Sequence, residues 1–550
     1  MTTRNAAIFY EADGFKTNGN RLLGRQAAGE SFLKGFALHS GVEVFHGFTD
    51  HPGKFKMFRD QVQGYLKKPA EYNWISANRI QELSQAGSLF YSGPSIAPFA
   101  WQRRHFNAGS FSLCGLTHTT CSAEAMQSIA DLITGPVEEW DALICTSHSV
   151  RKTAEHIHEN WAEYLKERTG GKPKVRAQLP VIPLGINCDD FEKTKATAPF
   201  VKKFKAEHGI NDGDVVFLFV GRLASHAKAH PLPMYHALEK AAQKTSKKIH
   251  LIQAGWFASP TIGEVFKQGA EEFCPSVNAI FIDGRLPAVR QHIWHVADVF
   301  TTLSDNIQET FGITPIEAMA AGLPVVATDW DGYRETMRDG AESLLVKTQM
   351  PEAGSGIALS YRYSGGIDSY DRYIGQASLF TNVDTDHCAA QYLDLIENDE
   401  KRQKMGQAGY EYVRKTFDWS VLVPKYQDLW ADLAARRPKE PVGVRRCANP
   451  LVDDPFATFE HYPTELITAK SILEYQDGAA GRVSQYSKHG LTRGVSHMLP
   501  DDEKLEALLQ TLSSEGPKTV ADAAILLGTN PRYTILFAGW LAKMDLVKIR

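Results

Sequence analysis

Residues 299–328 read VFTTLSDNIQETFGITPIEAMAAGLPVVAT, and the fold can be predicted outward from them. The apolar run Val299–Leu303 predicts a buried strand, and the polar stretch Ser304–Glu309 predicts a loop at the carboxyl end of that strand. A helix is expected to begin after Gly312, and a second strand at Val325–Thr328. Strand, loop, helix and strand in this order predict a βαβ unit of a parallel sheet.

The same alternation extends to both sides of this unit. Short apolar runs separated by longer amphipathic segments such as Gln26–Ala37 and Val150–Arg168 form two series, with the polar stretch Asp189–Pro199 between them. We therefore expect an α/β chain with two Rossmann-like, doubly wound domains whose ligands bind in the cleft between them, outside the carboxyl ends of the strands. The runs are Ala7–Tyr10, Val42–Phe45, Ser88–Tyr91, Phe111–Gly115, Ala142–Thr146 and Val181–Pro183, then Val215–Val220, Ile249–Ala254, Ala279–Asp283, Val299–Leu303, Val325–Thr328 and Leu344–Val346.

The last third of the chain departs from this pattern. Thr348–Thr381 lacks periodicity and predicts an inserted surface loop, whereas Ser420–Arg437 has an apolar stripe at helical spacing. Two helices, a turn, a third helix with Asn530 as its cap and Pro531 as its first residue, and a final apolar run predict a small, mainly helical winged-helix-like domain. The expected parts are residues 1–198 (acceptor-side domain), 199–419 (donor domain), 420–437 (a helix crossing back to the first domain), 438–465 (linker) and 466–550 (winged-helix-like domain).

Composition limits the classes of function. The 550 residues carry a formal net charge of -4, so no chain-wide cationic field would attract nucleic acid or anionic lipid. The seven cysteines include no Cys-x-x-Cys pair, which favours a reducing cytoplasmic location. No stretch is long and apolar enough to predict a transmembrane helix, and the first residues do not look like a secretory signal.

The loop and helix around Gly312 carry a candidate binding site. The amino end of a helix exposes unpaired amides that suit a phosphate or sugar hydroxyls, and Gly312 and Ile313 stand at that end. Gly312 also lets a ligand approach the backbone closely. Glu317, in the first turns of the helix, is placed to bind a ribose diol, and Glu309 on the preceding loop is placed to meet a sugar.

This stretch resembles the Glu-x7-Glu signature, here Glu309 to Glu317, of retaining glycosyltransferases of family 4. Asp331-Gly332 stands where that family usually has two glycines, and the resemblance extends over about residues 5–437. It implies the GT-B fold and a hexosyltransferase-type enzyme (EC 2.4). Such an enzyme would move a sugar from a nucleotide diphosphate to an acceptor hydroxyl with retention at the anomeric carbon. A GT-B sugar-nucleotide epimerase or a phosphorylase remains an alternative.

Two basic residues follow the run Val215–Val220. Arg222 and Lys228 lie beside a glycine turn, where a guanidinium fork and an ammonium group can clamp a diphosphate. The resemblance implies that both residues neutralise charge on the departing nucleotide. It implies no metal ion and no cofactor other than the donor itself.

The first domain contributes weaker candidates. The resemblance implies that Gly24 approaches the donor and that His118 is presented to the donor sugar. Arg103 and Arg104 are candidates for lining the acceptor side. The acceptor itself, whether glycan, lipid, protein or modified DNA, is left open.

The tail, residues 466–550, carries ten basic and nine acidic residues, too balanced for a typical DNA-reading face. We therefore expect a protein-docking domain. The alternative is a tail that holds DNA while the cleft glycosylates a modified base. Only Arg532, Tyr533 and Thr534, at the start of the last helix, would then be placed to touch bases.

Overall fold

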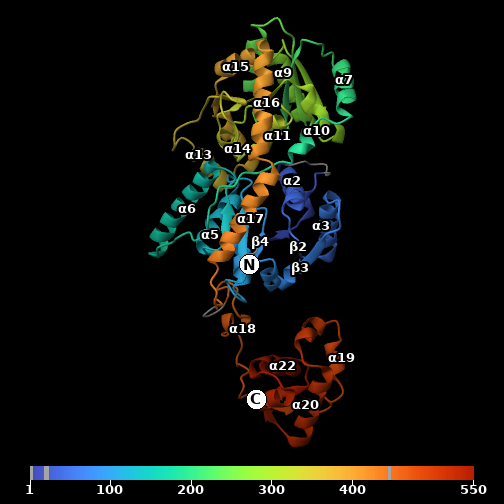
Figure 1. Ribbon diagram of the computed structural model, residues 1–550. Helices are drawn as coiled ribbons and strands as arrows, with labels where there is room; N and C mark the ends of the chain where they lie inside the picture. Colours follow the sequence, from blue (N-terminus) through green and yellow to red (C-terminus); the bar gives the residue numbers. More distant parts are fainter. Residues whose placement is uncertain (1–3, 18–23, 444–447) are drawn as a thin grey trace. The chain divides into compact units, whose positions relative to one another are not determined.

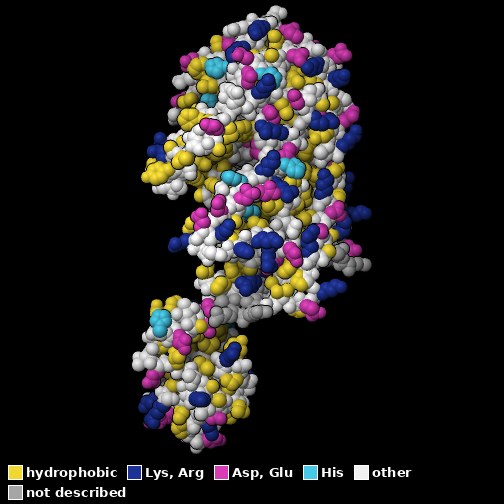
Figure 2. Space-filling view, turned by 90° about the vertical axis from the view of Figure 1, so that its left-hand side faces the viewer, with side chains coloured by type: hydrophobic (Ala, Val, Ile, Leu, Met, Phe, Trp, Pro, Cys, Tyr) yellow, Lys and Arg dark blue, Asp and Glu magenta, His cyan; other side chains and the backbone are white. Residues whose placement is uncertain are grey.

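A computed structural model describes residues 4–17, 24–443 and 448–550 of the chain (Figure 1). The chain forms two compact units, Met1–Asn449 and Pro450–Arg550. Residues 444–447 of the predicted linker lie outside the described residues. On the face of the molecule in Figure 2, basic and acidic side chains are interspersed.

The first sheet of the larger unit has six parallel strands in the order β3-β2-β1-β4-β5-β6. The chain winds outward from β1 in one direction and then from β4 in the other, so the order reverses between β1 and β4. The strands are β1 (Ala7–Phe9), β2 (Val44–Thr49), β3 (Glu71–Ser76), β4 (Ser88–Phe90), β5 (Ser112–Leu116) and β6 (Ala142–Ile144). The helices are α1 (Ala12–Phe15), α2 (Gly24–His39), α3 (Pro52–Tyr65), α4 (Ala97–Arg103), α5 (Ala123–Thr134) and α6 (His148–Thr169), with 3-10 helices at Ala77–Gln85 and Cys188–Phe191.

The second sheet repeats this topology in the order β12-β11-β10-β7-β8-β9, again with parallel pairing, and reverses between β10 and β7. The prediction of two Rossmann-like, doubly wound domains, the GT-B arrangement, is confirmed. The strands are β7 (Val215–Val220), β8 (Ile249–Gly255), β9 (Asn278–Asp283), β10 (Val299–Thr302), β11 (Val325–Thr328) and β12 (Ser343–Val346). The helices are α7 (Thr197–Glu207), α8 (Pro231–Ala242), α9 (Pro260–Phe273), α10 (Pro287–His292), α11 (Ile313–Ala320), α12 (Tyr333–Thr336), α15 (Thr385–Glu397) and α16 (Asp399–Thr416), with a 3-10 helix at Ile293–Val296.

Two strand predictions for the first sheet were wrong. Strand β3 has the sequence EYNWIS and lies at the edge of the sheet, so it is half-exposed and does not form a continuous apolar run. Val181–Pro183 is apolar but forms only one isolated bridge, between Val181 and Cys145. Hydrophobicity alone therefore missed a real edge strand and predicted a strand where the structure has a single pairing.

Helix α17 (Trp419–Arg436) packs against α2 of the first domain (Figure 1). The indole Nε1 of Trp419 donates to Ser31 Oγ at 2.9 Å, and Gln427 Nε2 donates to the carbonyl of Ser40 at 2.9 Å. A Cβ atom on Gly35 of α2 would lie 2.2 Å from Trp419 Cγ, so only glycine fits beneath this ring. The two helices therefore share one closely packed apolar interface.

The expectation of an irregular loop at Thr348–Thr381 was wrong. This segment holds helices α13 (Ile357–Ser364) and α14 (Tyr370–Leu379), and a short antiparallel pair, β13 (Thr348–Gln349) and β14 (Asn382–Val383), joins its ends. Helix α13 buries none of its residues, so it shows no apolar stripe from which a helix could be predicted.

The smaller unit combines helices with a three-stranded antiparallel sheet in the order β16-β15-β17. The predicted cap of its last long helix is confirmed, because the Asn530 side chain accepts from Arg532 N and Pro531 occupies the first turn. No helix in the described part of the chain is long and apolar enough to cross a membrane. The elements of this unit are α18 (Pro455–Thr458), β15 (Ile472–Tyr475), α19 (Val483–Ser487), a 3-10 helix at Arg493–Met498, α20 (Asp502–Glu515), β16 (Lys518–Thr519), α21 (Val520–Leu527), α22 (Pro531–Lys543) and β17 (Val547–Ile549).

Candidate active site

Two loops meet where the strand order of the second sheet reverses. One follows β7 and carries Arg222 and Lys228; the other follows β10 and carries Glu309. Because β7 and β10 are paired neighbours, both loops leave the same edge of the sheet. This is the position at which doubly wound sheets bind their ligands.

An ion pair joins the two loops. The Nζ atom of Lys228 lies 3.0 Å from Glu309 Oε2, although the residues are 81 positions apart in sequence. The side chains retain 35% and 12% of their surface exposed, respectively, so the lysine remains open to solvent. The structure therefore brings together two residues that the sequence analysis had placed on separate motifs.

Glu309 is held in its charged form. Burial alone would raise the pKa of this carboxyl, but the charge of Lys228, its hydrogen bond and the amides of Thr310 and Phe311 outweigh burial and lower the pKa. The amide of Thr310 donates to Glu309 Oε1 at 3.3 Å. The site thus contains a fixed carboxylate beside a cation whose remaining N–H groups are available to an anion.

Helix α11 starts beside this pair. Its cap residue Gly312 has a φ of 84°, and no side chain caps the first turn, so the amides of that turn, beginning with Ile313, have no side-chain acceptor. A Cβ on Gly312 would lie 2.0 Å from Cε1 of the buried Tyr333. Left-handed backbone and lack of space both require glycine here, and they leave a helix terminus suited to bind an anion.

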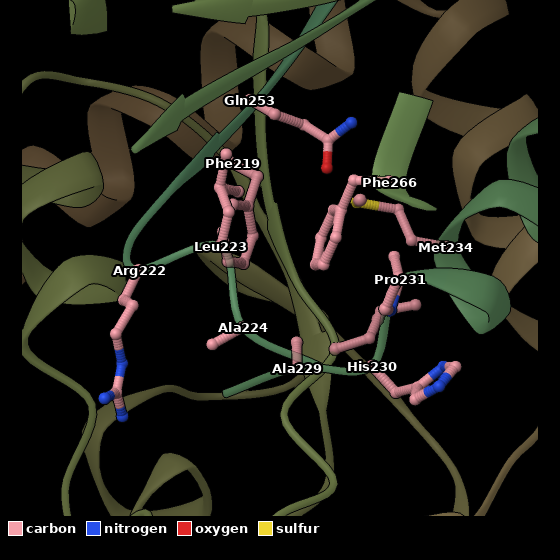
Figure 3. Close-up of a pocket in the computed structure, with 11 residues that line it drawn as sticks. Phe219, Arg222, Leu223, Ala224, Ala229, His230, Pro231, Met234, Gln253 and Phe266 are labelled. Atoms are coloured by element: carbon pink, nitrogen blue, oxygen red, sulfur yellow. The ribbon is translucent and has the colours of Figure 1, made fainter. Parts of the chain in front are cut away.

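Arg222 points away from the apolar pocket behind it. In Figure 3 its guanidinium extends to one side, whereas Phe219, Phe266 and Met234 line the pocket interior. Burial lowers the pKa of Arg222, while the nearby Asp371 partly offsets this effect. Arg222 is partly buried, and its guanidinium extends away from Phe219 and Phe266 in Figure 3.

Glu317 lies on α11 and is partly buried. Burial raises the pKa of this carboxyl to about 7, with a smaller opposing effect from Arg290. Its protonation therefore changes across the physiological range. No side-chain hydrogen bond joins Glu317 to the Lys228–Glu309 pair in the described residues, and its predicted ribose contact stays a prediction.

Asp331, which stands where the first glycine of a Gly-Gly pair was expected, has a strained backbone. Asp331 has a φ of 43°, in the left-handed region that a non-glycine residue rarely adopts. Burial raises its pKa to about 7, and the charges of Glu309 and Glu335 add to the shift. A Cβ on the following Gly332 would lie 2.7 Å from the carbonyl oxygen of Thr310, so this second glycine is sterically required.

Residues of the first domain contact the Glu309 loop directly. Thr310 Oγ1 donates to the carbonyl of His118, and Ser147 Oγ donates to the carbonyl of Thr310, each at 3.1 Å. Glu335 accepts from the amides of His148 and Ser149 at the start of α6, at 2.7 and 3.1 Å. The two domains therefore meet beside the candidate site. No local pattern indicated Ser147 or Glu335 as contacts, because their partners are more than 160 residues away.

His118 lies after β5 at this junction. Burial lowers the pKa of its imidazole to about 4, so the ring is neutral at pH 7. A neutral imidazole can donate from one nitrogen and accept at the other, which suits contact with sugar hydroxyls. The structure thus places His118 next to the Glu309 loop through its carbonyl, while its ring lines a small, mostly apolar cavity with Ser92 and Phe15.

The remaining candidates of the first domain are not joined to this site. Gly24 is exposed at the start of α2, and Arg104 stacks over Trp101 at 5.3 Å. Arg103 is fully buried and forms a two-pronged ion pair with Asp141 at 2.6 and 2.7 Å. Because Arg103 has no exposed surface, its guanidinium cannot contact an acceptor. Its partner Asp141 lies 38 residues away and was not evident from the sequence.

The three candidates of the tail differ among themselves. Tyr533 is 61% exposed and Arg532 is exposed at the start of α22. Thr534 is buried and bonded to Thr529 Oγ1 at 2.8 Å and to the carbonyl of Asn530, so it presents no surface to a base.

In the described residues, no cluster of three or more His, Cys, Asp or Glu side chains is arranged to hold a metal ion.

The part of the chain that carries the Lys228–Glu309 ion pair is similar to a known protein family. Residues 200–360 match the family "Glycosyl transferases group 1". These residues include Arg222, Lys228, Glu309 and Glu317 and all six strands of the second sheet. The match covers less than half of the 550 residues, and it lies within the second half of the larger unit.

Several curated relatives are glycosyltransferases. The chain is 26% identical over 196 residues to the alpha-monoglucosyldiacylglycerol synthase of Streptococcus pneumoniae, covering 36% of this chain and 39% of the relative. It is 28% identical over 247 residues to the D-inositol 3-phosphate glycosyltransferase of Geodermatophilus obscurus, covering 43% and 51%. The chain thus spans about half or less of the length of these relatives.

A solved structure is also similar. The Anabaena protein HepE in complex with UDP and glucose aligns with 78% of this chain and 99% of its own, at 13% identity and a TM-score of 0.48.

Proposed function

We propose that this protein is a retaining glycosyltransferase that moves a sugar from a nucleotide diphosphate to an acceptor hydroxyl. One observation carries the proposal: Lys228 and Glu309 form a partly exposed ion pair at the reversal point of the second sheet. Both residues lie within the region that matches glycosyl transferases of group 1. A cation and a carboxylate side by side suit a substrate with an anionic leaving group next to a sugar.

The leaving group would be bound by positive charge from two sources. Arg222 and Lys228 would contact the diphosphate, and the uncapped amides at the start of α11 would add the partial charge of a helix terminus. As the bond between the anomeric carbon and the phosphate oxygen breaks, negative charge accumulates on the nucleotide. Fixed cations at that position lower the barrier, because they are oriented before the reaction begins.

The acceptor hydroxyl would attack the same face that the phosphate leaves. Its oxygen forms the new bond to the anomeric carbon, and its proton passes to the departing phosphate, which keeps the atoms and charges in balance. Glu309 would orient the donor sugar and stabilise positive charge that develops on it; neutral His118 would hydrogen-bond the sugar. This assignment differs from a glycosidase, whose two carboxyls flank the scissile bond. We propose that no metal ion takes part.

The test is a screen of UDP-, GDP- and ADP-linked sugars for thermal stabilisation of the full chain. The donor with the largest shift is then incubated with inositol phosphate, a diacylglycerol and free sugars as acceptors, and products are identified by mass spectrometry. The first two acceptors are chosen because the names of relatives contain them. Transfer to an acceptor in EDTA supports the proposal; donor isomerisation alone would favour an epimerase, and phosphate-dependent cleavage of a glycoside a phosphorylase.

For the smaller unit we propose a winged-helix-like domain that docks a protein. The order of three long helices with a three-stranded antiparallel sheet supports this assignment. Burial of Thr534 leaves only Arg532 and Tyr533 to meet bases, which weakens the DNA alternative. Gel shifts of the full chain with duplex DNA at two salt concentrations test it, because phosphate contacts make binding steeply salt-dependent.

A further inference from the structure

The inserted helix α14 packs on the loop that follows β7. Ile374 is fully buried and clusters with Ala224 and Ala227 of that loop. A Cβ on Gly375 would lie 2.8 Å from the Cβ of His226, so only glycine allows this close approach. The insertion therefore touches the segment of chain that presents the two donor-binding cations.

A chain of hydrogen bonds runs from α14 through both site loops. The Tyr370 hydroxyl lies 3.1 Å from Gln308 Oε1, and Gln308 Nε2 donates to the carbonyl of Ala227 at 3.0 Å. Gln308 directly precedes Glu309, and Ala227 directly precedes Lys228. The Gln308 side chain thus joins the residues immediately before both members of the ion pair, and Tyr370 of the insertion holds that side chain.

The direction of these hydrogen bonds is fixed by chemistry. Because the Gln308 amide nitrogen donates to a carbonyl, its oxygen faces Tyr370, and the tyrosine must donate its only proton. The contact of 3.2 Å between the Tyr370 hydroxyl and Cys121 Sγ then requires the thiol to donate. Burial raises the pKa of Cys121, which keeps that proton on sulfur. The contact of 3.5 Å between Thr119 Oγ1 and Cys121 Sγ then has Thr119 as its donor. Thr119 and Cys121 both belong to the first domain, so the series of donors begins across the domain junction.

We infer that Tyr370 is a positioning residue of the transfer reaction: its hydroxyl, held by Cys121, fixes the spacing of the loops that carry Lys228 and Glu309. This inference rests on the proposed function. Tyr370 touches no reacting atom; it acts through Gln308. The insertion is thereby assigned a role in the reaction, and the two domains are coupled at the site by side chains outside the family's Glu-x7-Glu motif.

The first test removes only the hydroxyl. Tyr370→Phe keeps the ring in the apolar cluster, and Tyr361→Phe on α13, where the ring is 69% exposed, is the matched control. In the full chain with the preferred donor, we expect Tyr370→Phe to lower kcat about tenfold while KM for the donor changes less than about twofold. Hydrogen exchange should accelerate in peptides covering residues 222–230 and 304–311 but not elsewhere, and Tyr361→Phe should match the wild type in every measurement.

The second test asks whether Cys121 donates a hydrogen bond to Tyr370. Cys121→Ser retains a proton donor and should keep most of kcat, whereas Cys121→Ala should lower it about threefold. The double variant Cys121→Ala/Tyr370→Phe should be no slower than Tyr370→Phe alone, because both changes break the same chain. Additive losses would show that the cysteine acts by another route and would overturn its part of the inference.

Two outcomes overturn the role of Tyr370. Wild-type kcat and wild-type exchange in both loops for Tyr370→Phe would show that the hydroxyl positions nothing, and exchange raised evenly over the whole chain would show general destabilisation instead. If no nucleotide sugar binds the wild type, the proposed function fails. The exchange comparison would still decide whether Tyr370 orders these two loops.

Discussion

Each half of the larger unit contains a notable ion pair, and the two pairs differ in their access to water. In the first half, Arg103 and Asp141 are fully buried, and Asp141 also accepts from the amides of Leu113 and Glu138. In the second half, the Lys228–Glu309 pair retains exposed surface and stands at the strand-order reversal. A buried pair with every oxygen satisfied maintains the fold, whereas a pair left open to solvent can exchange its partner for a ligand.

The topology of the sheets does not explain why one ion pair is buried and the other is open to solvent. Both sheets have the same strand order, and each reverses between its first and fourth strands. After β1 of the first sheet comes Tyr10, fully buried, whose hydroxyl donates to Gln61 at 2.7 Å. After β7 of the second comes Gly221 and then Arg222. Topology therefore offers two equivalent positions for a site.

The largest effect should come from breaking the buried pair. Arg103→Ala leaves Asp141 charged and unpaired in the core, so we expect the free energy of unfolding to fall by about 3 to 5 kcal/mol. Urea unfolding measures the loss. Arg104→Ala, one position away and partly exposed, is the control and should cost less than about 1 kcal/mol. A normally stable Arg103→Ala enzyme with altered acceptor KM would instead restore the acceptor role expected from the sequence.

Removing the carboxylate of the open pair should affect turnover. We expect Glu309→Gln to lower kcat about 10²- to 10³-fold, since a fixed group that stabilises developing charge is lost. Stability and nucleotide diphosphate affinity should be nearly intact, because Lys228 is freed rather than buried without a partner. Steady-state kinetics and calorimetric titration separate the two effects. A parallel loss of nucleotide affinity would assign Glu309 to binding.

Removing the cations should affect binding first. Lys228→Ala and Arg222→Ala should each weaken nucleotide diphosphate affinity about 10- to 100-fold, the loss expected for a hydrogen bond between charged groups. Lys240→Ala on α8, whose ammonium pairs with Asp386, is the matched control and should bind as the wild type does. Equal affinity in all three variants would contradict a diphosphate clamp at this position.

The smallest effect concerns pH. The pKa of Glu317 is raised to about 7, so the carboxyl is protonated below pH 7 and ionised above it. An ionised carboxylate accepts ribose hydroxyls more strongly, so nucleotide-sugar affinity should rise about five- to tenfold between pH 6 and 8. Glu317→Gln should abolish this dependence. Titrations at several pH values check it; an equally steep change in Glu317→Gln would point to another group.

The same shift has a consequence for stability. Because the folded pKa of Glu317 lies above its unfolded value, the protonated form stabilises the fold fully below about pH 4.5, and this contribution is lost as pH rises through 7. In Glu317→Gln the contribution should persist at pH 8. The two readouts therefore move in opposite directions with pH, which distinguishes a binding role from a structural one.

The second domain could be predicted well because its central strands are buried on both faces. Strand β7 is a continuous apolar run, strand β10 is buried throughout, and the loops after them stand out by their charge. The pairing of Lys228 with Glu309 could not be predicted, since 81 residues separate them and only the neighbouring positions of β7 and β10 bring them together.

In the first domain and the insertion, the partners of two important side chains could not be predicted from the sequence. Arg103 looks like an exposed base until the fold places Asp141 against it. Tyr370 lies in a segment without periodicity, yet its hydroxyl contacts Cys121 of the first domain and Gln308 of the second. In each case the missing information was a long-range partner, which local hydrophobicity and charge do not reveal.

Helix α17 also affects how the chain can fold during synthesis. The apolar face of α2, with Phe32 and Phe36, is covered by Trp419, Tyr426 and Trp430, which the ribosome adds roughly 390 residues later. At typical rates of translation, the apolar face of α2 stays uncovered for about 20 to 80 s before α17 has been synthesised. Within the larger unit, the first domain is thus completed last although it is made first, and a nascent chain that has not reached residue 430 exposes this apolar surface to chaperones throughout that interval.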